Sequence, residues 1–123
     1  MIAPPKLLIS LSGLNGVLAI SAGAFGAHAV GDLAVKALLH TGAAYQLAAA
    51  AVGIGLLALR EAAGARTAAA LILSGGFVFG TSLYALAFSG VRLFGAVTPI
   101  GGVLMLAGFG WLTVRALTAR DGA

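Results

Sequence analysis

The sequence predicts an all-α membrane protein in which four transmembrane helices form one antiparallel bundle. Hydrophobic residues make up 61% of the 123 residues and charged residues only 8%, whereas a soluble domain carries roughly 25% charged residues. Four charge-free stretches each approach the ~20 residues that cross the hydrocarbon of a bilayer. They cover residues 7–30, 42–59, 67–91 and 98–114. We therefore expect one transmembrane domain over residues 1–123.

The basic residues predict the orientation of these helices. If the spans alternate in direction, five basic residues fall on the side of the two termini, and only two fall on the other side. The first group is Lys6, Arg60, Arg66, Arg115 and Arg120, and the second is Lys36 and Arg92. Cytoplasmic loops carry an excess of Lys and Arg, so both termini are expected in the cytoplasm. The net charge is +4, but the basic residues are scattered over the ends of the spans and form no basic patch. This argues against nucleic acid as a partner.

Two connections contain recognisable start and stop signals. After the first span, Gly31 and Asp32 can end one helix and cap another, and Asp32, Lys36 and His40 then share one helical face. This pattern predicts a short amphipathic helix that follows the first span in sequence, precedes the second, and lies in the outer membrane–water interface. Thr98 followed by Pro99 predicts the start of the fourth span, because the missing N–H of proline costs nothing at the first helical position.

Small and polar residues within the spans predict where the helices pack. Helices in lipid associate through close van der Waals approach, which small residues permit, and through interhelical hydrogen bonds. In the first span such residues recur at steps of three and four, and the later spans contain paired glycines. The predicted packing residues are Ser12, Asn15, Gly16, Gly23, Gly26, Gly76, Gly80, Gly101 and Gly102.

The remaining polar residues gather, by this topology, in the outer leaflet or at its boundary. They are His28, Tyr45, Gln46, Tyr84, Arg92 and Thr98. One interpretation is a polar layer that binds a small ligand, with histidine as a proton carrier or ligand. The other, which we favour, is an aromatic belt at the interface together with polar side chains that bond neighbouring helices.

No arrangement in the sequence predicts catalysis. There is no cysteine, no Ser/His/Asp combination and no phosphate-binding loop, since the Gly-rich segments lie within apolar spans. His28, His40 and Asp32 give fewer ligands than a structural metal site requires, although an oligomer would double them. We therefore predict no enzyme activity, no metal and no cofactor, and keep a metal or haem protein as the third hypothesis.

Four motifs resemble one family over nearly the whole chain. They are Gly23–His28 (GAFGAH), Thr41–Gln46 (TGAAYQ), Ser82–Tyr84 (SLY) and Thr98–Gly102 (TPIGG). Their order and spacing are similar to those of the domain of unknown function 423 family, which comprises small bacterial inner-membrane proteins with mitochondrial relatives. The resemblance implies a four-helix fold and a multi-pass location in the bacterial inner membrane, but no activity. The family commonly has a histidine where this chain has Ala49, so a site built on that histidine would be incomplete here.

Two functions from different classes follow from these observations. The first is a non-enzymatic accessory or interaction subunit that packs against a larger membrane complex or forms a homo-oligomer, because 19 glycines exceed the packing needs of one small bundle. The alternative is a carrier or binder of a quinone, lipid or proton at the outward-facing polar layer. It requires His28, Tyr45, Gln46, Tyr84 and Arg92 to meet at one cavity.

Overall fold

The computed structural model describes residues 5–59 and 61–119, and these residues form four long α-helices. Each helix is long and apolar enough to cross a membrane, which confirms the predicted number of spans. Arg60 and Arg120, two of the basic residues that predict the orientation, lie outside the described residues. The helices are α1 (Lys6–His28), α2 (Leu33–Ala58), α3 (Ala65–Ser89) and α4 (Arg92–Thr118).

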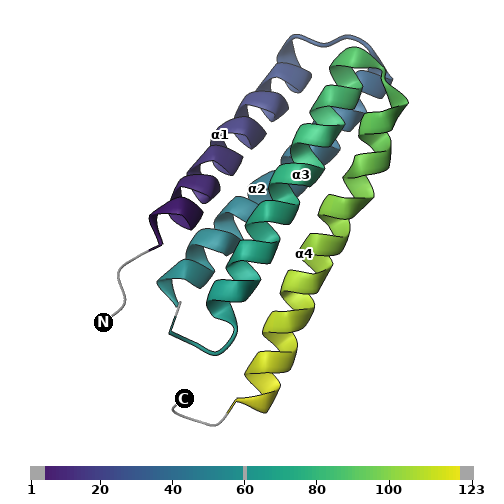
Figure 1. Cartoon of the computed structure of the whole chain (residues 1–123). Helices are drawn as coiled ribbons and strands as arrows, with labels where there is room; N and C mark the ends of the chain where they lie inside the picture. Colours follow the sequence, from purple (N-terminus) through teal and green to yellow (C-terminus); the bar gives the residue numbers. More distant parts are fainter. Residues whose placement is uncertain (1–4, 60, 120–123) are drawn as a thin grey trace.

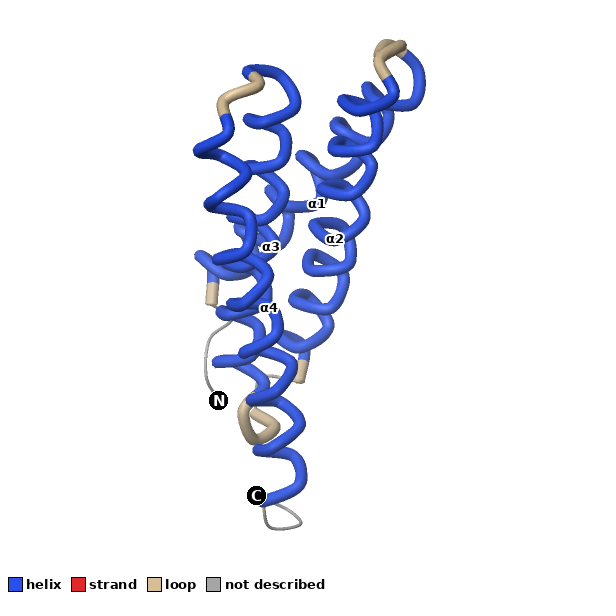
Figure 2. Tube along the Cα trace, turned by 90° about the vertical axis from the view of Figure 1, so that its right-hand side faces the viewer, coloured by secondary structure: helices blue, strands red, loops and turns tan. Residues whose placement is uncertain are grey.

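The helices follow one another side by side, with both ends of the chain at the same end of the bundle (Figure 1). The connections are confined to the two ends of the bundle (Figure 2), and short connections leave each helix to pack on the next. Extensive contacts join α1 to α2, α2 to α3 and α3 to α4, with a smaller contact between α1 and α3. Among the described helices, α3 is therefore the one that packs substantially on each of the others, whereas α4 packs chiefly on α3.

Glycine shapes both ends of α3. Gly64 precedes the helix with φ +80° and Gly90 follows it with φ +70°, in the left-handed region that costs other residues about 1–2 kcal/mol. The N–H of Gly90 donates to the carbonyl of Leu86 at 2.8 Å, which satisfies one carbonyl of the last turn. These two glycines let the chain reverse into and out of the central helix within a few residues.

The structure does not confirm a separate interfacial helix after α1. Asp32 caps a helix as expected, since its Oδ1 accepts from the N–H of Val35 at 3.0 Å, but this helix is α2 itself, which continues without a break to Ala58. Nothing stops it between residues 33 and 42. Gly42 is a packing position inside the helix rather than a stop, because an added Cβ there would lie 2.6 Å from Cε1 of Tyr84.

The predicted start of the fourth span is also corrected. α4 begins at Arg92, so that Pro99 lies inside the helix and Thr98 is not its N-cap. Instead, the Thr98 hydroxyl bonds within the bundle, 2.6 Å from Oγ of Ser82 and 3.3 Å from the carbonyl of Phe94. Proline is tolerated inside membrane helices where nearby hydroxyls and neighbouring helices satisfy the backbone groups it leaves free.

Glycines and alanines set how closely α3 approaches α2 and α4. A Cβ added to Gly76 would overlap the Cβ of Ala49, and one added to Gly101 would overlap the backbone nitrogen of Phe79. The Cβ added to Gly101 would also lie 2.6 Å from the carbonyl oxygen of Gly75. The backbones of α3 and α4 therefore lie against each other at this crossing. The main apolar core lies between α2 and α3 and consists of Ala49, Leu56, Leu57, Ala65, Ala68, Ala69, Ile72 and Leu73.

The other predicted packing residues fall into two groups. Ser12, Asn15 and Gly26 on α1 are buried, and Gly80 on α3 is buried as well, while a Cβ added to Gly23 would lie at ordinary contact distance, 3.5 Å, from the Cβ of Ala43. Gly16 and Gly102 differ from these. An added Cβ at either position would meet nothing within 4 Å, so packing within the chain does not require glycine there.

The neighbouring glycines of α4 give a direct test of this packing. Gly101→Ala places a methyl group against the backbone of α3, which cannot rotate away, so we expect a loss of about 1–3 kcal/mol in the free energy of unfolding. Gly102→Ala meets open space and should be neutral or stabilise by up to about 1 kcal/mol through helix propensity. Denaturation in mixed micelles, followed by the fluorescence of the single tryptophan Trp111, measures both. Equal effects at the two positions would contradict the crossing described here.

Candidate functional site

A chain of hydrogen bonds, which we call the polar chain, joins three helices inside the bundle. The hydroxyl of Tyr84 on α3 donates to Oε1 of Gln46 on α2 at 2.7 Å. Nε2 of Gln46 donates to Oδ1 of Asn15 on α1 at 2.8 Å, and Nδ2 of Asn15 donates to the carbonyl of Leu73 at 3.1 Å. Asn15 and Gln46 are both 0% exposed, so the two amides have left water and lipid completely.

Two glycines make room for the polar chain. A Cβ added to Gly80 would lie 2.7 Å from Cδ of Gln46, and one added to Gly42 would lie 2.6 Å from Cε1 of Tyr84. The amide from α2 therefore rests on a glycine of α3, and the tyrosine ring from α3 rests on a glycine of α2. This exchange brings the side chains within hydrogen-bonding distance without separating the helices.

Two further hydrogen bonds link adjacent helices outside the polar chain. Oγ of Ser12 donates to the carbonyl of Ala50 at 2.8 Å, which joins α1 to α2. The hydroxyls of Ser82 and Thr98 lie 2.6 Å apart and join α3 to α4. With the polar chain, each pair of consecutive helices is thus linked by at least one buried or partly buried hydrogen bond.

The chemistry of the polar chain is that of a structural link. Its donors all point the same way, from the Tyr84 hydroxyl towards the Leu73 carbonyl. The two amides between them carry no titratable proton, and among the residues that the structure describes no base accepts a hydrogen bond from the hydroxyl of Tyr84. Hydrogen bonds between membrane helices average about 0.6 kcal/mol, so the polar chain fixes which residues face one another more than it adds stability.

The six residues predicted for an outer polar layer make different contacts in the structure. Gln46 and Tyr84 bond to each other, and Thr98 bonds to Ser82 instead. The ring of Tyr45 is 54% exposed and packs at 5.0 Å on the ring of Phe79. His28 and Arg92 are exposed at helix ends. Among the described residues, then, only one pair of the six is hydrogen-bonded together, and no three His, Asp or Glu side chains gather where they could hold a metal.

An apolar groove with a volume of about 470 Å³ lies between α2 and α4, and no sequence pattern predicted it. It exists because α4 packs on α3 and leaves α2 uncovered, a property of the fold that no local pattern encodes. Ala49, at the position where related proteins were expected to have histidine, lies in the groove and is 2% exposed against Gly76. The groove is lined by Thr41, Tyr45, Ala48, Ala49, Ile72, Phe79, Gly102, Met105, Leu106 and Phe109.

Comparison with known proteins identifies the family. Residues 22–102, more than half of the chain, match the family described as Protein of unknown function (DUF423). The chain belongs to this family. The match confirms the predicted resemblance, and within the DUF423 segment lie Gln46, Tyr84 and Thr98, whereas Asn15 precedes it.

Three relatives of this DUF423 protein are described as membrane proteins. A UPF0382 membrane protein of Staphylococcus epidermidis is 37% identical, covering 94% of this chain and 97% of the relative. A UPF0382 membrane protein of Haemophilus influenzae is 38% identical, covering 86% and 88%. The UPF0382 inner membrane protein YgdD of Escherichia coli is 32% identical, covering 94% and 92%. No solved structure matches the chain.

The two tyrosines test the polar chain in this DUF423 protein. Tyr84→Phe removes the donor to Gln46 and leaves a buried amide oxygen unsatisfied, so we expect a loss of about 1 kcal/mol in the free energy of unfolding. Tyr45→Phe is the matched control, because the Tyr45 hydroxyl makes no hydrogen bond within residues 5–59 and 61–119. Unfolding in mixed micelles measures both variants. A Tyr84→Phe variant as stable as wild type would show that the hydroxyl contributes nothing to the bundle.

Proposed function

We propose that this DUF423 protein is a non-enzymatic membrane subunit that packs against other membrane spans, either in a larger complex or in a homo-oligomer. The observation that carries the proposal is the set of glycines within the helices whose added Cβ would meet nothing within 4 Å. They are Gly13 and Gly16 on α1, Gly55 on α2, and Gly102 and Gly110 on α4. No atom of residues 5–59 and 61–119 occupies the space that a Cβ on these glycines would take.

The cost of these glycines supports the proposal. A glycine inside a helix destabilises it by roughly 0.5–1 kcal/mol relative to alanine. At Gly76, Gly80 and Gly101 the opposing helix occupies the space and offsets that cost. The outward glycines have no such compensation within the chain. In a bilayer, close approach of a second helix is the interaction that small residues favour.

The alternative, a carrier of a small ligand at an outer polar layer, has less support. It needs several polar side chains aimed into one cavity. Gln46 and Tyr84 use their polar groups on each other, while Tyr45 packs against Phe79. The interaction subunit requires no such convergence, because its contact surface is made of apolar and small residues.

We further infer that the termini face the cytoplasm of the bacterial inner membrane. The support is the excess of basic residues that the sequence places on the side of the two termini, five against two, together with the relative named an inner membrane protein. With this orientation, His28 and Arg92 lie on the outer side. The opposite orientation would place the larger number of basic residues outside the cytoplasm, against the usual excess of Lys and Arg in cytoplasmic loops.

Association can be tested in a mild detergent. We expect native sizing and crosslinking in membranes to give a species larger than the 12.0 kDa chain. Gly16→Leu or Gly102→Leu should shift it towards the monomer, because the added side chain fills space that the chain leaves open. Val17→Leu, which changes a side chain that is already 63% exposed and apolar, is the control.

The partner separates the two forms of the proposal. Self-crosslinked products alone indicate a homo-oligomer, and a stoichiometric co-purifying protein indicates a larger complex. A strictly monomeric chain with no co-purifying protein would remove the proposal altogether. Because neither leucine variant meets an atom of the chain at Cβ, loss of association need not mean loss of the fold.

Orientation can be tested with single cysteines, since the native chain has none. We expect Ala34→Cys, at the exposed start of α2, to react with a membrane-impermeant maleimide added to spheroplasts. Ala62→Cys, in the exposed turn before α3, should react only after the membrane is permeabilised. The reverse pattern of labelling would place the termini outside.

A further inference from the structure

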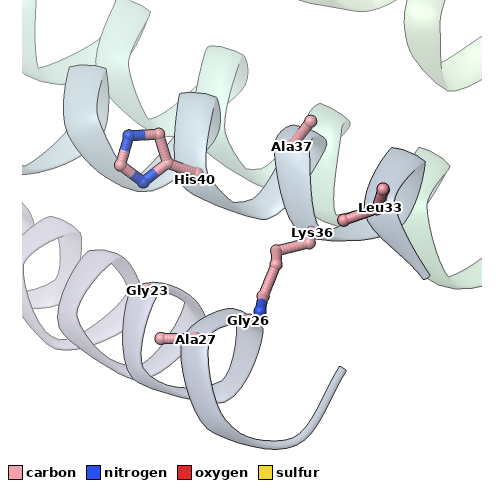
Figure 3. A pocket seen from close by; sticks show the side chains of 7 residues that line it. All are labelled: Gly23, Gly26, Ala27, Leu33, Lys36, Ala37 and His40. Carbon is pink, nitrogen blue, oxygen red and sulfur yellow. The ribbon is translucent and has the colours of Figure 1, made fainter. Parts of the chain in front are cut away.

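A pocket of about 430 Å³ lies between α1 and α2 (Figure 3). The end of α1 and the start of α2, which line it, lie at the end of the bundle opposite the start of α1 and the end of α4 (Figure 1). One wall comes from the last turns of α1 and is almost without side chains, while the other comes from the first turns of α2 and includes two basic groups. The lining residues are Gly23, Gly26, Ala27, Leu33, Lys36, Ala37 and His40. The pocket therefore combines apolar walls with two groups that can donate hydrogen bonds, the ammonium of Lys36 and the imidazole of His40.

Lys36 reaches from α2 across to α1 beside Gly26, and His40 lies one turn further along α2 (Figure 3). Four residues of helix separate the two groups by about 6 Å along the axis. Within the described part of the chain, neither side chain makes an ion pair or a hydrogen bond. The nearest acid in sequence, Asp32, is used as the cap of α2 through Val35.

An unpaired ammonium group at the edge of a membrane span calls for a counter-charge, because its burial without one is costly. The side chain of Lys36 is partly buried. Below the pocket, towards the middle of the spans, the same two helices present apolar side chains to the surroundings: Val17 and Ile20 are each 63% exposed, and Leu47 is 45% exposed. The surface thus changes from basic to apolar along the direction of a lipid molecule.

We propose that this pocket binds the phosphate of an anionic phospholipid, with Lys36 as the charged contact and His40 as a second donor. Lysine binds phosphate as a point charge, and the glycine wall of α1 lets the headgroup approach the ammonium closely. The acyl chains then lie along the apolar surface of α1 and α2. A soluble phosphate would gain nothing from that surface, so the apolar walls favour a lipid. This inference does not depend on the proposed association.

A competing account is that Lys36 only complements the negative end of the α1 helix dipole. The two accounts differ in what Lys36→Gln changes. A dipole interaction affects the stability of the bundle equally in every lipid. A headgroup contact affects the affinity for an anionic lipid and leaves the affinity for a zwitterionic lipid unchanged.

The experiment titrates the full chain, in a neutral detergent, with dioleoylphosphatidylglycerol or dioleoylphosphatidylcholine and counts bound lipids by native mass spectrometry. We expect wild type to bind the anionic lipid more tightly, and Lys36→Gln to weaken that binding about fivefold. Lys6→Gln, the same charge change at the opposite end of α1, is the control and should have no effect. His40→Gln should weaken binding less than Lys36→Gln does.

A second variant guards against a folding defect. Ala27→Phe adds bulk at an exposed position of the pocket without changing charge, and should also reduce binding of the anionic lipid. The proposal is overturned if Lys36→Gln and Ala27→Phe both bind phosphatidylglycerol as wild type does, or if Lys6→Gln weakens binding as much as Lys36→Gln. It is also overturned if inorganic phosphate at equal concentration displaces the lipid, since the site would then recognise the anion alone.

Discussion

The close approach of α3 to its neighbours is the constraint on which the rest of the bundle depends. Lipid chains are as apolar as leucine, so burying hydrophobic side chains does not by itself draw these helices together. Gly76 and Gly80 let α2 approach one side of α3, and Gly75 with Gly101 lets α4 approach another. Dispersion contacts are short-ranged, so an added methyl at these crossings would weaken many contacts at once.

The buried polar groups depend on that same approach. Gln46 reaches both Asn15 and Tyr84 only because Gly80 leaves space for its amide. In hydrocarbon an amide without hydrogen-bond partners is costly in free energy. Sliding α2 along α3 would break the hydrogen bond between Gln46 and Tyr84 and is therefore unfavourable. Packing thus supplies the proximity, and the polar chain selects one register among those that the small residues would allow.

Sequence patterns predicted the spans better than their ends. Charge-free windows locate hydrocarbon, but α2 starts before the charged Lys36 and α4 includes Pro99, because helices extend through the interface and tolerate proline where hydroxyls such as that of Thr98 lie nearby. The polar candidates could be recognised by residue type. Which of them meet could not be, since the Gln46 and Tyr84 contact depends on how two helices are rotated about their axes.

The uneven packing of α4 has a consequence for how the protein is made. In sequence, the last residue of the polar chain is Tyr84. The buried residues of the main core all come from α2 and α3. Once the residues up to Ser89 have entered the bilayer, the nascent chain therefore already contains every residue of the polar chain and of the main core. The last helix can then join a preformed three-helix unit as it leaves the ribosome and insertion machinery, against the single partner, α3, on which it chiefly packs.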